Sequence, residues 1–233
     1  MKRTAKEVRA RCREIFGNEW WDVDPETKRQ RQDEAIKTLD QSAKYIPKSV
    51  PKQLKQDLVR QDIIALETVV KAISNVKNVS IRRISTSFDE CYESLRNTMP
   101  IVNELRWLYH GSAPDTVPKI ISEGYNRSFC GKNATAYGKG VYFAKDISYS
   151  AQPLYSPPDK DGFKCILANK VLVGRSCLGK ANQTVPDMFD NTRRYDTTVD
   201  SVSNPRIFVV YKDMQAIPEY EIKFKIVKHL SKA

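Results

Sequence analysis

The sequence has few residues that could hold a metal ion or form disulfide bonds. It contains only two histidines, and none of its five cysteines belongs to a C-x-x-C pair. Zinc sites and disulfide frameworks require these residue types at close, regular spacing. The cysteines here are instead far apart along the chain: Cys12, Cys91, Cys130, Cys165 and Cys177. We therefore expect reduced, mainly structural thiols and no metal cofactor.

The sequence also lacks a long apolar run. No segment approaches the roughly 20 apolar residues that a helix needs to cross a bilayer. The basic N-terminal segment MKRTAKEVRARCREIF has no apolar stretch of the kind found in secretory signals. Glu7 and Glu14 disfavour a transit peptide, because such peptides are poor in acidic residues. These absences predict a cytoplasmic or nuclear protein that does not associate with membranes.

Neither common nucleotide-binding loop is present, although residues 131–144, GKNATAYGKGVYFA, combine glycine with lysine. A Walker loop requires G-x-x-x-x-G-K-[ST] and a following helix. Here Gly131 and Gly138 stand too far apart, and a glycine follows Lys139 where a hydroxyl is required. The Rossmann pattern has its glycines after a strand, whereas these glycines precede the strand-like VYFA. The segment is therefore predicted to be a loop that leads into a strand carrying Tyr142.

What the sequence does contain is basic charge and a globular composition. The formal net charge is +11, which invites a role in nucleic-acid binding. The basic residues are spread along the chain, however, and no basic run alternates with aromatic residues. Hydrophobic residues make up 40% of the chain, which predicts a folded domain rather than a disordered one. We expect weak attraction to acidic partners without specific recognition of a nucleic acid.

Helix-forming sequence comes first and strand-forming sequence later. Residues 25–45 and 54–73 have the composition or periodicity of helices. Two shorter helices are predicted, one starting near Asp89 and one ending at Gly124. Six segments rich in β-branched and aromatic residues predict strands: VSIRRISTS, LRWLYHG, VYFA, FKCILANKVLV, RIFVVYKD and YEIKFKIV. This order favours an α+β fold with antiparallel pairing over alternating βαβ units.

Four motifs in series carry more information than any single residue. Alone, His110 is more typical of a structural histidine and Tyr142 of core packing. The motifs are LYHGS, GYNRSFCGKNATAYGKGVYFA, SYSAQPLYSPPDKDG and RRYDTTVDSVSNPRIFVVYKDMQAIPEYEI. In this order they resemble the catalytic domain of poly(ADP-ribose) polymerase-like (diphtheria-toxin-like) ADP-ribosyltransferases. The likeness is closest to the mono-ADP-ribosylating branch of macrodomain-bearing members.

The resemblance covers roughly residues 76–228 and implies the α+β ADP-ribosyltransferase fold. In that fold two mainly antiparallel sheets, flanked by short helices, bind NAD⁺ between them as a co-substrate. Residues 51–233 are expected to form the catalytic domain, and residues 1–50 a helical N-terminal extension of unknown role. The helices before residue 76 are too few for the autoinhibitory domain of the family's polymerases, so we expect no gating of NAD⁺.

The resemblance assigns roles around the nicotinamide half of NAD⁺. His110 is expected to hydrogen-bond a ribose hydroxyl. The backbone of Gly111 is expected to grip the carboxamide, because a residue without a side chain lets the ligand come close. Ser150 is expected to bond the same carboxamide. Tyr142 and Tyr155 are expected to cover the two faces of the pyridinium ring, where stacking and cation–π attraction stabilise the cation. Tyr149 is a less favoured alternative to Tyr155.

The same resemblance implies further contacts with NAD⁺. The residues assigned to it are Ser112, Arg127, Tyr137 and Ala144. Segment 125–139 is expected to lie over the adenosine diphosphate half, with Arg127, Lys132 and Lys139 near its phosphates. These three charges are equally well interpreted as solvated loop residues.

The third catalytic position departs from the polymerases. Beside His110 and Tyr142, it falls on Ile207, where chain-building members carry a glutamate that activates the acceptor. General-base assistance contributes about 10²–10⁴ in rate, so its absence predicts a first transfer without elongation. Glu219 or Glu221 could in principle replace it. We interpret both as solvated charges of the last strand, on the face opposite its apolar residues.

The resemblance therefore implies an NAD-dependent mono-ADP-ribosyltransferase with a His-Tyr-Ile motif. Its expected partners are protein acceptors, including the enzyme itself, and nucleic acid is a weaker candidate acceptor. We expect a monomer. The alternative is a catalytically silent module that binds NAD⁺ or ADP-ribose or acts as a scaffold, and a basic nucleic-acid binder is the least favoured interpretation.

Overall fold

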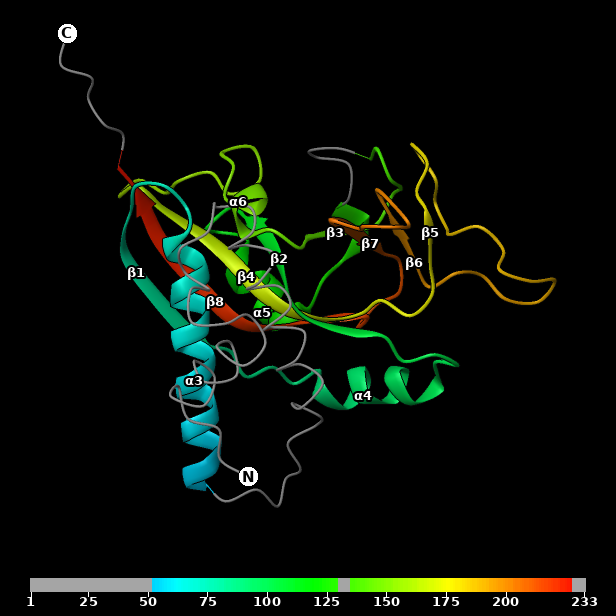
Figure 1. Ribbon diagram of the computed structural model, residues 1–233, viewed down its shortest axis with the longest axis horizontal. Coiled ribbons are helices and arrows are strands. Elements are labelled where there is room, and N and C mark those ends of the chain that lie inside the picture. Colours follow the sequence, from blue (N-terminus) through cyan, green and yellow to red (C-terminus); the bar gives the residue numbers. More distant parts are fainter. Residues whose placement is uncertain (1–51, 130–134, 228–233) are drawn as a thin grey trace, which may run out of the picture. The chain divides into compact units, whose positions relative to one another are not determined.

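A computed structural model describes residues 52–129 and 135–227. The chain divides into two compact units after Asp62, and the sheet and the candidate site belong to the second unit. The helix predicted for residues 25–45 lies outside the described residues. The described elements are, in order (Figure 1), α3 (Lys52–Lys71), β1 (Val76–Arg83), α4 (Asp89–Thr98), β2 (Glu104–Ser112), α5 (Val117–Glu123), the 3₁₀ helix η1 (Arg127–Phe129), β3 (Val141–Ala144), α6 (Ile147–Ser150), β4 (Phe163–Leu172), β5 (Ser176–Leu178), β6 (Thr197–Val199), β7 (Ile207–Val210) and β8 (Ala216–Ile226).

Helices α3, α4 and α5 form where the sequence predicts them, whereas α6 and η1 were not predicted. In α3, Leu66 and Val70 are one helical turn apart and are both fully buried. Helix α4 begins at the predicted Asp89, with an acidic first turn that suits the positive end of the helix dipole. Helix α5 ends at Gly124, whose φ of 79° is in the left-handed region that glycine tolerates. The Gly124 amide donates to the carbonyl of Ile120 at 2.9 Å and closes the last turn.

The strands form one hydrogen-bonded sheet of eight strands, in the order β1-β8-β4-β2-β3-β7-β6-β5. The predicted α+β class is correct, and every pairing is antiparallel except β5 with β6. The expectation of two separate sheets is wrong. The sheet is continuous because β2 pairs with β4 on one side and with β3 on the other.

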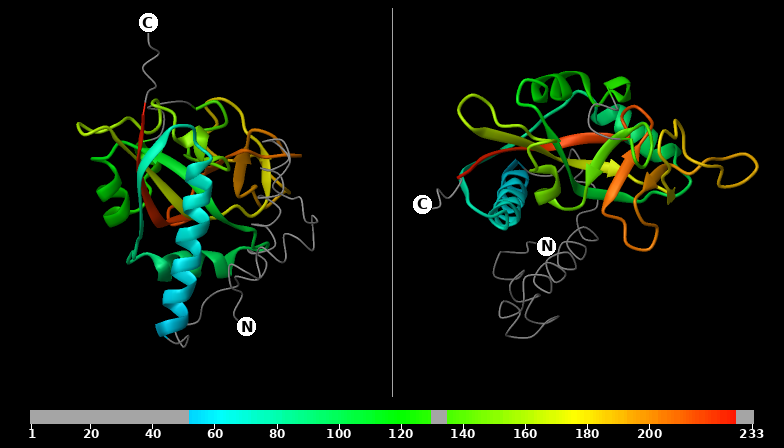
Figure 2. Two further views of the ribbon diagram at one scale, coloured as in Figure 1. Left: turned by 60° about the vertical axis from the view of Figure 1, so that its left-hand side comes forward. Right: turned by 90° about the horizontal axis from the view of Figure 1, so that it is seen from above.

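The two sides of that junction differ in length and in pairing. One half consists of β1, β8, β4 and β2, which are 8 to 11 residues long. The other half consists of β3, β7, β6 and β5, which are only 3 or 4 residues long. Figure 2 shows the long strands β4 and β8 crossing one half and the short strands gathered in the other. Across the described residues, β2 and β3 are in register only at Tyr109 and Ala144.

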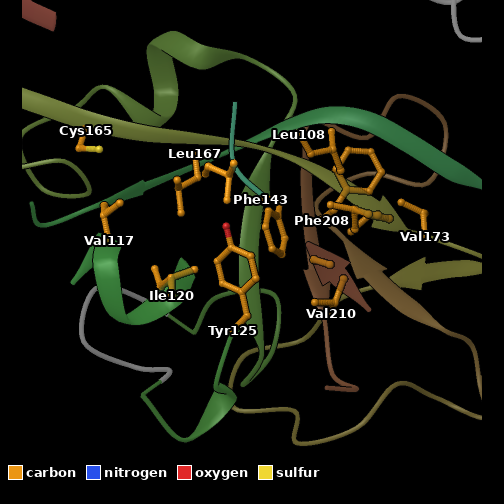
Figure 3. Close-up of a cluster of buried hydrophobic side chains, with 14 residues drawn as sticks. Leu108, Val117, Ile120, Tyr125, Phe143, Cys165, Leu167, Val173, Phe208 and Val210 are labelled. Carbon is orange, nitrogen blue, oxygen red and sulfur yellow. The ribbon is translucent and has the colours of Figure 1, made fainter. Parts of the chain in front are cut away.

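A buried cluster of hydrophobic side chains packs beside the junction (Figure 3). Strands β2, β3, β4 and β7 contribute Leu108, Phe143, Leu167 and Phe208, and helix α5 contributes Val117 and Ile120. Tyr125, which follows α5, packs edge-on against Phe143 with 5.0 Å between ring centroids. Its hydroxyl donates to the side-chain oxygen of Asn169. The aromatic rings of Tyr125 and Phe143 therefore pack together next to the end of β2.

Two carboxylates of β8 are buried, contrary to the interpretation of solvated strand charges. Glu219 and Glu221 are each 6% exposed. Glu219 accepts from Arg106 at 2.8 Å and lies 3.6 Å from Lys170. Glu221 accepts from Arg82, which is its direct partner on β1. Burial alone would raise the pKa of Glu221, but the hydrogen bond and the nearby positive charges lower it below its ordinary value.

These ion pairs explain why the alternation of apolar and charged residues along β8 wrongly predicted that Glu219 and Glu221 are exposed to solvent. The strand is covered on both faces, so most of its residues are buried whether they are apolar or charged. Opposite charges brought in by β1, β2 and β4 compensate the buried carboxylates. Both glutamates therefore act as structural ion-pair partners within the long half of the sheet.

The cysteines within residues 52–129 and 135–227 are free: Cys91, Cys165 and Cys177. Burial raises the pKa of the Cys165 thiol to about 12, which makes it a poor nucleophile. No group of three or more histidine, cysteine or acidic side chains in these ranges could hold a metal ion. None of the described helices is both long and apolar enough to cross a membrane.

Candidate functional site

The candidate site lies where the two halves of the sheet meet. Strand β2 ends with His110, Gly111 and Ser112, and β3 carries Tyr142 and Ala144. Helix α6 and the turn after it bring Ser150 and Tyr155, and β7 begins with Ile207. Residues that are 97 positions apart in sequence, His110 and Ile207, are thus carried by β2 and β7, the two strands that pair with β3.

His110 is held by its backbone neighbour and by the aromatic core. Its Nδ1 lies 2.8 Å from the carbonyl oxygen of Tyr142. Because a carbonyl only accepts, Nδ1 carries the proton and Nε2 is left as an acceptor. The ring packs edge-on against Tyr125 at 5.1 Å between centroids. Burial lowers the pKa of His110 despite the carbonyl contact, so the imidazole is neutral at neutral pH.

Gly111 is in contact with the segment that carries Ser150 and Tyr155. A Cβ atom added to Gly111 would lie 2.3 Å from the carbonyl oxygen of Ser150 and 3.1 Å from Cβ of Tyr155. No side chain fits at this distance, so packing within the protein already requires glycine here. The structure therefore brings these three residues together, and their contacts with NAD⁺ remain predictions.

Ser150 has its hydroxyl proton committed to the protein. Its side chain is 3% exposed, and Oγ donates to the carbonyl of Tyr109 at 3.0 Å. A hydroxyl has one donor and two acceptor positions, so Oγ can still accept a hydrogen bond from a ligand. Asp146 caps α6 through the amide of Ser148 at 2.8 Å and fixes the start of the short helix that carries Ser150.

Tyr155 is stacked on Tyr149. The two rings are 4.9 Å apart at an angle of 23°, and their hydroxyls lie 2.8 Å from each other. Burial, and next the hydrogen bond with Tyr155, raise the pKa of Tyr149 well above its ordinary value, so the Tyr149 ring stays neutral at physiological pH. The two candidates for the second aromatic position thus form one pair, with Tyr155 on the side of Gly111 and Tyr149 37% exposed.

Tyr142 fastens the loop that precedes its own strand. Its hydroxyl accepts from the amide of Tyr137 at 3.0 Å and donates to the carbonyl of Gly138 at 2.8 Å. The carbonyl of Tyr137 in turn accepts from the Thr198 hydroxyl at 2.6 Å. The part of the loop after residue 134 is therefore tied both to β3 and to β6, and the Tyr142 ring is half-buried at its base.

Ile207 lies opposite Ala144 in the register of β3 and β7. It is 6% exposed and belongs to a cluster with Ala144, Val209 and Tyr142. Its amide donates to Oδ1 of Asp200 at 3.0 Å, and the amide of Arg206 donates to the same oxygen. The predicted third catalytic position thus lies next to Tyr142 in an apolar setting, and the carboxylate that contacts it binds backbone.

The remaining predicted contacts are more widely spread. Ser112 is buried and pairs with Cys165 of β4. The Arg127 guanidinium donates to the Tyr211 carbonyl at 3.1 Å. Lys139 is exposed, although its amide donates to the Gln183 carbonyl at 2.6 Å. Lys132 lies outside the described residues. The roles of Arg127 and Ser112 in binding NAD⁺ remain predictions.

Comparison with known proteins identifies the family. A model of the poly(ADP-ribose) polymerase catalytic domain matches residues 53–188, which is more than half of the chain. The chain belongs to this family. The match begins within α3 and runs through β5, so it includes the ends of β2 and β3 and the turn after α6.

Curated relatives agree with that assignment. The mouse (Mus musculus) protein mono-ADP-ribosyltransferase PARP10 is 37% identical over 174 residues, covering 73% of this chain and 18% of the relative. The human (Homo sapiens) protein mono-ADP-ribosyltransferase PARP14 is 40% identical over 141 residues, covering 58% of this chain and 8% of the relative. This chain thus spans less than a fifth of the length of either protein.

A solved structure supports the fold. The PARP domain of Arabidopsis RADICAL-INDUCED CELL DEATH1 superimposes with a TM-score of 0.57 at 18% identity, covering 71% of this chain and 98% of that domain. At this low identity, the superposition shows that the two proteins share a fold and says nothing about their activities. The family model and the superposition thus agree on the poly(ADP-ribose) polymerase fold.

Several residues that shape the site had no sequence signal. Tyr125 supports the His110 ring, and Thr198 with Tyr211 supports the loop before β3. Lys164 binds two carbonyls in the turn after α6. Each acts through backbone atoms or ring edges of residues distant in sequence, so residue type and spacing could not reveal it.

Proposed function

We propose that this protein transfers a single ADP-ribose unit from NAD⁺ to an acceptor and releases nicotinamide. The observation that carries the proposal is the neutral His110, which is bonded to the Tyr142 backbone with Nε2 left for a ligand, beside the segment in which Gly111 meets Ser150 and Tyr155. These are the residues that the family uses around nicotinamide. The names of the similar curated proteins support single transfer.

The geometry suits a carboxamide and a flat ring. Ser150 Oγ donates to Tyr109, which leaves its lone pairs to accept from the carboxamide NH₂. The backbone of Gly111 is proposed to complete the grip on the carboxamide. The rings of Tyr142 and Tyr155 are proposed to cover the two faces of the nicotinamide, where the positive charge of the pyridinium favours aromatic neighbours.

His110 is proposed to bind the ribose next to nicotinamide. With the proton on Nδ1, its Nε2 accepts from a ribose hydroxyl. Within the described residues Nε2 has no hydrogen-bond partner, so this acceptor position is available to a ligand. Arg127, Tyr137, Ser112 and Ala144 are proposed to contact the rest of the dinucleotide.

The reaction breaks the bond between ribose C1′ and the nicotinamide nitrogen. The bonding electrons leave with nicotinamide, which becomes neutral, and C1′ develops oxocarbenium character. A nucleophile of the acceptor forms the new bond to C1′ and loses its proton. The described residues contribute by orienting the dinucleotide and excluding water from its ring, so the rate derives mainly from positioning. We propose that no metal takes part.

Ile207 is proposed to limit the reaction to one transfer. An isoleucine cannot remove a proton from the ribose hydroxyl that a growing chain would use. Asp200 contacts Ile207, but its Oδ1 is bonded to two backbone amides. An acidic side chain of the acceptor can supply the missing carboxylate. We therefore propose protein acceptors, including the enzyme itself, with nucleic acid as a weaker candidate, and a monomeric enzyme in the cytoplasm or nucleus.

Labelled NAD⁺ tests the proposal directly. Purified protein is incubated with NAD⁺ labelled in the adenylate, and label is followed on the protein itself and on added proteins and RNA, together with free nicotinamide. We expect a discrete small mass increase rather than a polymer smear. The His110→Ala variant should lose the signal, whereas Tyr195→Ala, on the loop between β5 and β6, should keep it. NAD⁺ binding without nicotinamide release would instead identify a silent binding module.

A further inference from the structure

Lys164 of β4 is buried without a carboxylate partner. Its residue is only 6% exposed, although lysine is among the side chains least often buried. Its Nζ donates to the carbonyls of Ala151 and Ser156, each at 2.8 Å. Among the residues that the structure describes, no acidic side chain lies within ion-pair distance of it. Two carbonyl dipoles thus take the place of a counter-charge.

The two carbonyls bracket the turn that follows α6. Ala151 directly follows Ser150, and Ser156 directly follows Tyr155. Inside the turn, the amides of Tyr155 and Ser156 both donate to the Gln152 carbonyl. A single ammonium group therefore spans the backbone between the two residues that contact Gly111.

The exit of the turn is attached to the same place on β4. The Ser156 hydroxyl donates to the Cys165 carbonyl at 2.9 Å and accepts from the Cys165 amide at 3.1 Å. Cys165 is paired with Ser112, the residue after Gly111. Through Cys165, the exit of the turn is thus anchored beside the end of β2. Gly111, at that end of β2, is the other part of the proposed nicotinamide site.

We propose that Lys164 is a positioning residue that fixes the separation of Ser150 and Tyr155 around the nicotinamide ring. This inference rests on the proposed function. An ammonium group suits the role because its three donors diverge from one atom and can bind two carbonyls at once. The amide of glutamine also has two N–H donors, but it is neutral and ends one bond nearer the backbone than Nζ, and an apolar side chain leaves both carbonyls unpaired.

A second lysine of β4, the half-buried Lys170, is compensated in a different way. Lys170 lies 3.6 Å from Glu219 and is compensated by charge. Lys164 is compensated only by carbonyls of the turn beside the site. Removing the Lys164 ammonium therefore changes the shape of that turn, whereas removing Lys170 changes an ion pair away from it.

The test compares Lys164→Met, which keeps the length of the side chain, with the same substitution at the exposed Lys160. Lys164→Met should raise the KM for NAD⁺ about tenfold, on the scale of one charge-assisted hydrogen bond, with a smaller effect on kcat. Lys160→Met should leave both unchanged. Amide hydrogen exchange across 151–156 should accelerate in Lys164→Met alone, with or without NAD⁺.

A double-mutant cycle separates positioning from general destabilisation. In a Tyr155→Ala background, the Lys164→Met effect on KM should fall below about threefold, because the ring that Lys164 positions is already absent. If the effects of Lys164→Met and Tyr155→Ala on KM simply multiply, as for independent residues, the inference is overturned. If Lys164→Met does not fold, Lys164→Gln decides, since its neutral amide ends one bond short of the ammonium position and so weakens both contacts, and an unchanged KM in that variant overturns the inference.

The two proposals fail in different ways. A wild-type protein that neither binds NAD⁺ nor releases nicotinamide refutes the proposed function, and the inference falls with it. A wild-type protein that is active, with KM and hydrogen exchange unchanged in both Lys164 variants, refutes only the positioning role.

Discussion

The long and short halves of the sheet are stabilised in different ways. In the long half, neighbouring strands are in register over many residues, and two buried glutamates of β8 are paired with arginines of β1 and β2. In the short half, pairing covers three or four residues per strand, and side chains such as Tyr142 and Thr198 bond the loops directly.

The difference indicates how the protein combines stability with a ligand site. The long half contributes the end of β2, and the short half contributes β3 and β7 with the loops that lead into them. The residues proposed to contact NAD⁺ come from both halves and meet where a single residue pair, Tyr109–Ala144, joins them. Substitutions in the two halves should therefore separate effects on stability from effects on NAD⁺.

The largest expected loss of stability comes from the long half. Glu219→Gln leaves Arg106 and Lys170 without their buried counter-charge, and should lower the free energy of unfolding by about 3 kcal/mol. Denaturant unfolding measures this, with the exposed Glu123→Gln as control. The KM for NAD⁺ of the folded variant should match that of the wild type. A raised KM with unchanged stability would place Glu219 in the site instead.

The junction should respond in the opposite way. Gly111→Ala forces the Ser150 carbonyl and Tyr155 apart, with a cost of about 1–3 kcal/mol from overpacking. Because it displaces the proposed carboxamide site, kcat/KM for NAD⁺ should fall on the order of 10²-fold. Gly162→Ala is the control, since its Cβ meets open space while its φ of 82° strains the backbone. Equal losses of activity in both variants would contradict the assignment.

The smallest predicted effect is the change in the free energy of unfolding with pH that results from His110. The folded protein holds the pKa of His110 below 6.5 through burial. As pH falls through 6.5, the unfolded chain takes up a proton that the folded chain does not, so the free energy of unfolding decreases. The His110→Gln variant should show a shallower decrease in chemical denaturation at several pH values. A steeper decrease in the variant would mean that the folded pKa is raised.

The parts of the fold that were predicted correctly have strong local patterns. Strands β4 and β8 are long and contain many apolar residues, and Gly124 marks the end of α5. Strands β5 and β6 were missed because each has only three residues and forms by pairing with strands distant in sequence. The continuity of the sheet was missed because it depends on one residue pair, which no sequence pattern records.

In the candidate site, too, residues within recognisable motifs were predicted, whereas contacts that depend on the folded structure were not. His110, Tyr142 and Ser150 were found because their order along the chain resembles a family. The burial of Glu219 was not predictable, because its partner Arg106 comes from β2, which is separated from β8 by another strand. Lys164 was not found because its partners are backbone carbonyls, which every residue type provides.

The contact at Gly111 also bears on how relatives of this protein can be read. Since the Ser150 carbonyl already leaves no room for a side chain, a descendant that had lost NAD⁺ binding would still need glycine at this position to fold. Its presence in a relative is therefore evidence of shared architecture and not of retained catalysis. The imidazole of His110, whose Nε2 is left for a ligand, is the better indicator of an active enzyme.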